Sequence, residues 1–384
     1  MDRDVARLKP SSGGLHPIEV INMRVHARLA FLFAIFLPCN LPLFAQYSGG
    51  APVNPKVDVP ANPQATPPND RVFLDVVVTA KSGPPVAGLQ QQEFKVFDNK
   101  SPRPIDSFQA LGGDQPPIKT ILLVDDVNAN FQHVAYERSE MSKFLHANGG
   151  HLVLPTALAF LTDKGLETQG EFSADGNALA STLDKYDVGL HSVLRSSGIY
   201  GAVERFQLSL SALLQLTNRE AALPGRKIVL WVSPGWPLLS GPGVELQMDD
   251  KQRQQIYSDV IRLSNLLRAG HITIYSIDPL GSSDFATRSF YWQSFQKGPS
   301  KPSQADWGNI ALQVLAVQSG GLAITVTNDI TASLQRCVAD TQNYYELSFV
   351  PSLEGRPGEW HEIQVRVDKP GLTARTRTGY YPKP

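Results

Sequence analysis

The sequence is poor in cysteine, with only Cys39 and Cys337 among 384 residues. If the N-terminal segment that contains Cys39 is removed, no internal disulfide can form. An exported domain without a disulfide depends on its hydrophobic core, and a chain of this length with 42 % apolar residues can build one. We expect Cys337 to be a small buried apolar residue.

Neither sign of charge is in excess, because 35 Lys and Arg balance 36 Asp and Glu. A nucleic-acid partner is not predicted, since it requires clustered basic residues. The sequence also lacks a GxSxG elbow, a Walker A loop, an HExxH motif and paired CxxC motifs. We therefore predict that the protein is not an enzyme. A Ser–His–Asp triad is assembled only in space, so an exported hydrolase remains a third alternative.

Long apolar runs are absent except near the N-terminus, where residues 23–46 read MRVHARLAFLFAIFLPCNLPLFAQ. Arg24 and Arg28, a short apolar stretch and Ala45 before Gln46 form the pattern of a secretory signal peptide. The stretch is too short to span a bilayer, and we predict no membrane span after cleavage. Met23 fits the start of this signal. We expect a secreted, periplasmic or cell-envelope protein, with an uncleaved N-terminal anchor as the alternative.

After a Pro-rich stretch, the chain alternates between two kinds of pattern. Residues 71–108 and the segment from Tyr344 onward read as short strands separated by turns. The strands of each end are too few to be stable alone, so we expect the two groups to pair. Residues 119–337 alternate buried strands with amphipathic helices, which predicts a doubly wound, mostly parallel α/β sheet.

The predicted fold is therefore an α/β domain inserted in a small β-sandwich built from both chain ends. The predicted segments are a leader at 1–45, a linker at 46–70, half-sandwiches at 71–112 and 344–384, and the α/β domain at 117–343.

The strand KTILLVD ends in Asp125 and is followed by DVNAN. This strand end resembles that of the von Willebrand factor type A domain, over about residues 117–343. More of the chain resembles the VWFA-related acidobacterial domain family, through LDVVVTAKSGPPVAGLQQQEFKVFDN, LLVDDVNANF, KIVLWVSPGWP, QSGGLAITVTNDITASLQRCVADTQNYYELSFVP and LTARTRTGYYP. The resemblance implies a Rossmann-like fold and a role in protein binding or adhesion.

Metal-binding type A domains hold Mg²⁺ with a strand-end Asp, two hydroxyl residues, a Thr and a second Asp. Here Asp125 is present, but Val127 and Ala129 occupy the hydroxyl positions and cannot ligate. The strand KIVLWV continues into Ser-Pro-Gly, so the second carboxylate is missing too. The resemblance implies a degenerate site at Asp125, Asn128 and Ser197.

Two alternatives remain for this loop. A frame shifted by one residue would use Asp126, Asn128 and Asn130, and would require the strand to end one residue later. The other interpretation is that Asp125 and Asn128 bind loop backbone and cap the next helix, as Asx residues commonly do. We predict no organic cofactor; a divalent cation, Mg²⁺ or Ca²⁺, remains open.

Aromatic side chains provide candidates for a binding surface. Residues 281–306 form a long connector that is rich in aromatics, and such residues often anchor protein interfaces. The alternative is a satellite core that packs this loop. We expect a rim at the strand ends formed by 125–131, 196–200, 233–240 and 281–300. The candidate partner-binding residues are Phe131, Trp236, Phe290, Tyr291 and Trp292.

The sequence thus predicts an exported protein that binds a protein partner through this rim. The alternative is a metal-independent structural or assembly scaffold of the cell envelope.

Overall fold

The computed structural model describes residues 71–81, 83–112, 118–129, 131–186, 198–237, 239–240, 247–279, 291–352 and 356–382. The predicted leader and linker lie outside these residues. Contacts divide the chain into Met1–Pro63 and Gln64–Pro384, and every described residue belongs to the second unit. Within the described part, no helix is both long and apolar enough to cross a bilayer.

A mixed sheet with strand order β10-β9-β8-β5-β6-β7 occupies the middle of the described chain. Its strands are β5 (Lys119–Asp125), β6 (His151–Thr162), β7 (Gly165–Asp175), β8 (Lys227–Val232), β9 (Ile272–Ile277) and β10 (Ala323–Ile324). Five strands run parallel, and β7 returns antiparallel beside β6. The carboxyl ends of the parallel strands therefore share one edge, where ligands of such sheets usually gather.

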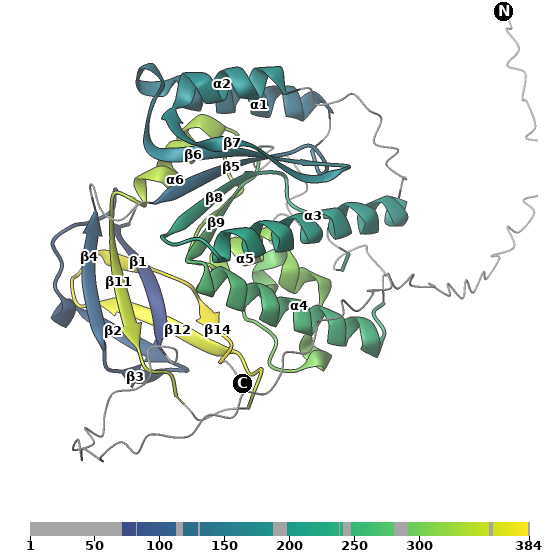
Figure 1. The fold of residues 1–384 in the computed structure, drawn as a ribbon. Helices are drawn as coiled ribbons and strands as arrows, with labels where there is room; N and C mark the ends of the chain where they lie inside the picture. The colour runs from purple at the N-terminus through teal and green to yellow at the C-terminus, as the bar shows by residue number, and fades with distance from the viewer. Residues whose placement is uncertain are drawn as a thin grey trace, which may run out of the picture. The chain divides into compact units, whose positions relative to one another are not determined.

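Helices cover both faces of this sheet (Figure 1). The helices are α1 (Phe131–His146), α2 (Gly176–Lys185), α3 (Gly198–Ala221), α4 (Asp250–Ala269), α5 (Leu312–Gln318) and α6 (Ile330–Ala339). Leu122 and Leu230 pack in the core with α1, α2 and α6, whereas Leu123 and Trp231 pack in the core with α3, α4 and α5. Alternate strand residues point to opposite faces, so strands buried on both sides are apolar throughout.

Two antiparallel sheets combine strands from both ends of the described chain. Their orders are β13-β1-β11-β4 and β14-β12-β2-β3. The strands are β1 (Val72–Ala80), β2 (Phe94–Asp98), β3 (Ser101–Arg103), β4 (Ser107–Gly112), β11 (Asn343–Phe349), β12 (His361–Val367), β13 (Leu372–Arg375) and β14 (Gly379–Tyr380). Both sheets contribute to one apolar core, including Leu74, Val96, Leu347 and Val365. Each sheet therefore depends on chain segments more than 200 residues apart.

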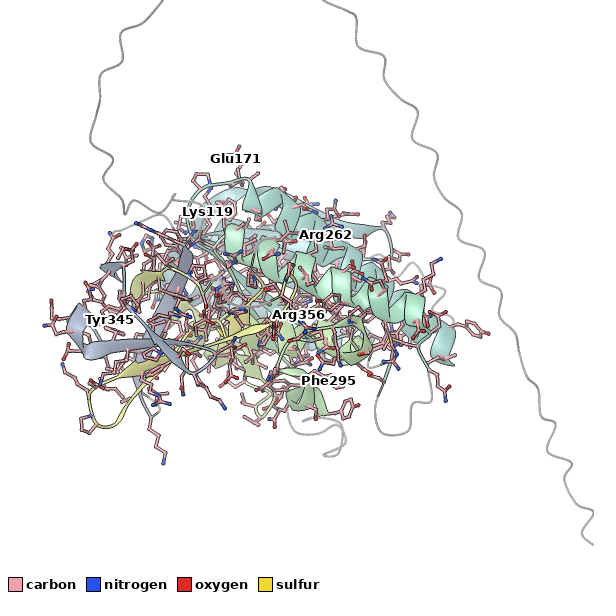
Figure 2. All side chains as sticks on the ribbon, turned by 90° about the horizontal axis from the view of Figure 1, so that it is seen from below. Lys119, Glu171, Arg262, Phe295, Tyr345 and Arg356 are labelled. Atoms are coloured by element: carbon pink, nitrogen blue, oxygen red, sulfur yellow. The ribbon has the colours of Figure 1, made fainter. Side chains whose placement is uncertain are left out.

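Tyr345, which is labelled in Figure 2, connects this core to the turn-rich segment after β1. Its ring lies 4.9 Å from that of Phe94 and 5.8 Å from that of Phe108. Its hydroxyl donates to the carbonyl of Val86 and accepts from the amide of Leu89. The α/β domain with antiparallel sheets beside it agrees with the predicted fold class. Five short 3₁₀ helices complete the described elements: η2 (Gln91–Glu93), η3 (Ala147–Gly150), η5 (Tyr291–Phe295), η6 (Pro302–Gln304) and η7 (Trp307–Ile310).

Candidate functional site

Asp125 is fully buried at the carboxyl end of β5. Its Oδ1 accepts hydrogen bonds from the amides of Val127 and Asn128, at 3.1 and 3.0 Å. Its Oδ2 accepts from Nε1 of Trp231 at 3.0 Å and from Nδ2 of Asn128 at 2.8 Å. Burial raises the pKa of Asp125, while the hydrogen bonds from Asn128 and Trp231 lower it. Both oxygens therefore hold N–H donors, as in the Asx-type interpretation.

The neighbouring positions also serve the fold. Val127 and Ala129 are buried, and Val127 belongs to the same core as Trp231. Asn128 also donates from Nδ2 to Oγ of Ser209 on α3, at 2.9 Å. β5 ends at Asp125, one residue earlier than the shifted frame with Asp126 requires. The described residues thus do not fit the type A metal arrangement; Ser197 and Asn130 lie outside the described residues.

The turn that follows β8 directs the side chain of Trp236 into the core. Ser233 Oγ accepts from the amide of Gly235, which has a φ of +92°. A Cβ on Gly235 would lie 2.3 Å from Nε2 of Gln313, so this conformation and this close approach require glycine. The indole of Trp236 lies against Trp231, with ring centroids 5.6 Å apart. Trp236 is 5 % exposed, so the expectation that it projects from the rim is corrected.

The aromatic connector is partly a core element. Trp292 is buried and packs with Ala311 and Val314, as the satellite-core alternative holds, and this corrects its placement on an exposed rim. Tyr291 is half-buried, with its ring 5.1 Å from that of Phe295. Phe290 lies outside the described residues, and Phe131 is described only as the first residue of α1.

Another buried acid near this edge has no signature in the sequence. Glu137 on α1 is fully buried, and neither of its carboxyl oxygens has a hydrogen-bond partner within the described chain. Burial raises its pKa to about 9, with further contributions from Asp125, Asp126 and Asp278. Glu137 is therefore neutral at pH 7, which avoids a buried uncompensated charge.

The sandwich contains a buried His–Asp pair of the kind found in hydrolases. Nδ1 of His361 lies 2.9 Å from Oδ1 of Asp98, whose Oδ2 accepts from the Tyr380 hydroxyl at 3.0 Å. Nε2 of His361 is buried, and no hydrogen bond joins it to a described residue. The pair therefore has a tyrosine neighbour, and no serine or cysteine nucleophile bonds to it in the described chain.

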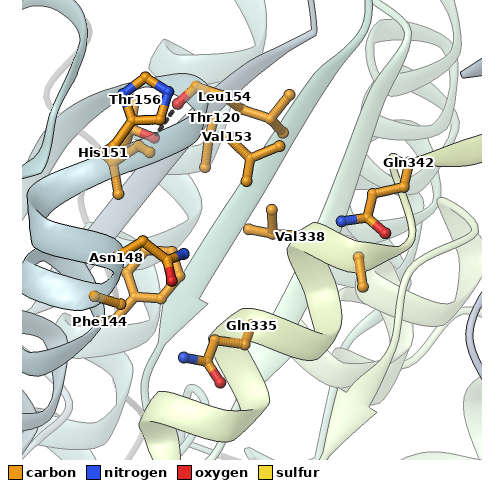
Figure 3. Close-up of a pocket in the computed structure, with 13 residues that line it drawn as sticks. Thr120, Phe144, Asn148, His151, Val153, Leu154, Thr156, Gln335, Val338 and Gln342 are labelled. Carbon is orange, nitrogen blue, oxygen red and sulfur yellow. Dashed lines mark hydrogen bonds between the residues drawn. The ribbon is translucent and has the colours of Figure 1, made fainter. Parts of the chain in front are cut away.

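A pocket of about 190 Å³ opens at the amino edge of the sheet, between the end of α1 and α6 (Figure 3). Thr120, Phe144, Leu154, Gln335 and Val338 are among its lining residues. His151 is the one titratable side chain in this lining, which otherwise consists of apolar, amide and hydroxyl groups. Such a lining provides no acid–base pair.

Four of the exposed large apolar side chains in the described residues belong to elements at the carboxyl edge of the sheet. Tyr200 is 72 % exposed and Ile199 40 %, both in the first turn of α3. Val326 follows β10 and is 69 % exposed, and Tyr136 on α1 is 40 % exposed. The Tyr136 hydroxyl donates to the carbonyl of Asn328, which places α1 beside the loop after β10. We call these four side chains the apolar rim.

One group of side chains has the spacing to hold a divalent cation. The ligand atoms of Asp75, His271 and Glu346 all lie within 4.8 Å of one another. The group is at the amino end of β9, away from the apolar rim. A divalent cation is thus compatible with this group of described residues.

The strand order and flanking helices are compatible with a von Willebrand factor type A-like fold. Solved structures that share features with the chain include the pilus adhesin SpaC from Lactobacillus rhamnosus GG, at 10 % identity and a TM-score of 0.33 over 83 % of this chain and 49 % of SpaC. The chain thus spans about half the length of that adhesin.

Two smaller structures are also similar. The SpRpn10 VWA domain matches at 15 % identity and a TM-score of 0.20, over 42 % of this chain and 74 % of that domain. The manganese-loaded TRAP protein of Plasmodium vivax matches at 10 % identity and a TM-score of 0.30, over 70 % of this chain and 96 % of TRAP. No protein-family model and no curated protein match the sequence.

Proposed function

We propose that this chain is an exported, non-catalytic protein that binds a protein partner through the apolar rim. The observation that supports this is the exposure of Tyr200, Ile199, Val326 and Tyr136 around one edge of the α/β domain. Large exposed apolar side chains often mark interaction surfaces, and tyrosine is frequent among residues that dominate binding energy. The rim thus replaces the buried tryptophans as the predicted contact surface.

Site-specific photo-cross-linking tests this proposal with a control just beyond the far end of α3. A photoreactive phenylalanine analogue replaces Tyr200 in one full-length protein and Leu223 in another. Leu223 follows the opposite end of α3 and is 40 % exposed, like Ile199. Each protein is irradiated with the envelope fraction of the cells that produce it.

We expect a discrete protein adduct from position 200 and none from position 223. The absence of an adduct at position 200, or equal adducts from both positions, contradicts the proposal. Matching thermal melting curves for the two proteins show that both are folded.

A metal-independent scaffold is the second candidate, and the saturated oxygens of Asp125 favour it over adhesion through a cation bridge. Such a bridge requires a metal with an open position for the partner's carboxylate. The adduct from position 200 should therefore persist in EDTA if the contact is a docking interface. Its loss in EDTA, with recovery on adding Mg²⁺, would instead indicate cation-dependent adhesion.

A further inference from the structure

Asp75, Glu346 and His271 come from three distant segments of the chain. Asp75 is on β1, Glu346 is on β11, and His271 lies in the turn between α4 and β9. Their ligand atoms lie within 4.8 Å of one another, and all three side chains are half-buried. This combination of one imidazole and two carboxylates lies outside the apolar rim and the Asp125 loop.

Strand register brings the two carboxylates together. Asp75 pairs directly with Glu346 in the antiparallel ladder between β1 and β11. Leu74 and Val76 point into the sandwich core, so Asp75 points to the other face of its sheet. Like charges directly opposite each other on neighbouring strands destabilise a sheet. The pair therefore requires compensating positive charge.

The third side chain approaches from the α/β domain. His271 has a φ of +48°, in the left-handed region, which is uncommon for residues other than glycine but which histidine adopts more often than most. Its ring lies 6.2 Å from the ring of Phe73, which is on the same face of β1 as Asp75. The turn thus presents an imidazole beside the carboxylate pair.

The positive charge nearby compensates the negative charge of Asp75 more than that of Glu346. Arg226 places Nε 3.6 Å from Oδ2 of Asp75, and its guanidinium lies over the ring of Tyr344 at 4.3 Å. Neither Glu346 nor the His271 ring makes a side-chain hydrogen bond to a described residue. Burial and the charge of Asp75 raise the pKa of Glu346, while His271 and Arg226 lower it. The carboxylate oxygens of Glu346 therefore accept no hydrogen bond from a described N–H group and can serve as metal ligands.

We propose that Asp75, His271 and Glu346 bind a first-row transition-metal dication, with Zn²⁺ the best-matched ion. Zinc takes imidazole nitrogen and carboxylate oxygen at about 2.0 to 2.2 Å, and three protein ligands leave a fourth position for water. Tetrahedral geometry then separates ligand atoms by about 3.3 to 3.5 Å, which side-chain rotation can reach from the observed spacing. The ion would join β1, β11 and the α4–β9 turn and keep water at its fourth position.

Calorimetric titration of the EDTA-treated, untagged full-length chain with ZnCl₂ tests the site. We expect one high-affinity ion per chain and a rise in melting temperature on zinc binding. His271→Ala and Glu346→Gln should each weaken this binding by at least about tenfold. His146→Ala is the matched control, because it removes an exposed imidazole on α1 and should leave the affinity unchanged.

Folding of the variants is checked by melting in EDTA, where Glu346→Gln should be at least as stable as the wild type because it removes the like-charge pair. Absence of zinc binding overturns the proposal. Equal affinity in the wild type, His271→Ala and Glu346→Gln also overturns it, since the ion would then reside elsewhere. These results are independent of cross-linking at position 200, which concerns the opposite edge of the sheet.

Discussion

Asp125 on the mixed sheet and the Asp75–Glu346 pair on the antiparallel sheet beside its amino edge differ in what surrounds their oxygens. At the carboxyl edge, Asp125 is fully buried and accepts bonds from two backbone amides, an indole and an amide side chain. At the amino edge, Asp75 and Glu346 are half-buried and face one arginine and one histidine. Donors that saturate a carboxylate make it part of the fold, whereas unoccupied oxygens remain available for a ligand.

The largest expected effect follows from removing the saturated carboxylate. Asp125→Ala leaves the amides of Val127 and Asn128 and the indole of Trp231 without their acceptor. Buried donors without partners are costly, so the free energy of unfolding should fall by about 3 to 5 kcal/mol. Urea denaturation of the full-length chain measures this change.

Asp163→Ala provides the control, because Asp163 is exposed in the turn between β6 and β7. Its effect should stay within about 0.5 kcal/mol. If Asp125→Ala is as stable as this control, the hydrogen bonds of Asp125 are not structural and the comparison between the two edges fails.

Glu137 should make stability depend on pH. Its pKa is about 9 in the folded protein and 4.5 in the reference state. The folded state therefore binds more protons between these values, and stability falls as pH rises from about 4.5 to 9. Glu137→Gln should remove this slope and increase the free energy of unfolding at pH 7 by on the order of 2 to 3 kcal/mol. Urea denaturation across this pH range measures both.

Glu140 is the matched control, almost one turn further along α1. A hydrogen bond from Lys143 lowers the pKa of Glu140, so Glu140→Gln should not stabilise the protein at pH 7. A loss of stability in Glu137→Gln, together with no change in pH slope, would contradict this prediction, because the carboxyl would then not be neutral in the folded state.

The sequence was sufficient to predict elements whose signal is local. The apolar run before Asp125 predicts a buried strand, and β5 covers residues 119–125. The Asx interpretation of Asp125 also depends on neighbours within three residues, and its bonds to the loop backbone agree with it. The side chain of Asn128 instead bonds Asp125 and Ser209, and no described bond of either residue caps α1. The α/β class was accessible for the same reason, since alternation of strand and helix is visible along the chain.

Features that depend on distant contacts were not predictable in this way. Trp236 points inward because Gly235, in the turn after β8, adopts a positive φ next to Gln313 of α5. Glu137 looks like any acid in a helical stretch, and only the packing of α1 shows that it is buried. Asp75 and Glu346 are 271 positions apart and meet through strand register, which the sequence pattern does not specify.

The smallest expected effect distinguishes the amino edge from the carboxyl edge. In EDTA, Glu346→Gln relieves the repulsion with Asp75 and should increase the free energy of unfolding by about 0.5 kcal/mol. With saturating Zn²⁺ the order should reverse, because the wild type gains binding energy that the variant has lost. Glu362→Gln, at an exposed position on β12, should show no reversal. Urea denaturation with and without zinc measures the sign. The variant could instead remain more stable than the wild type in saturating zinc. Arg226 and His271 alone would then compensate the two carboxylates, and neither edge of the sheet would bind a metal.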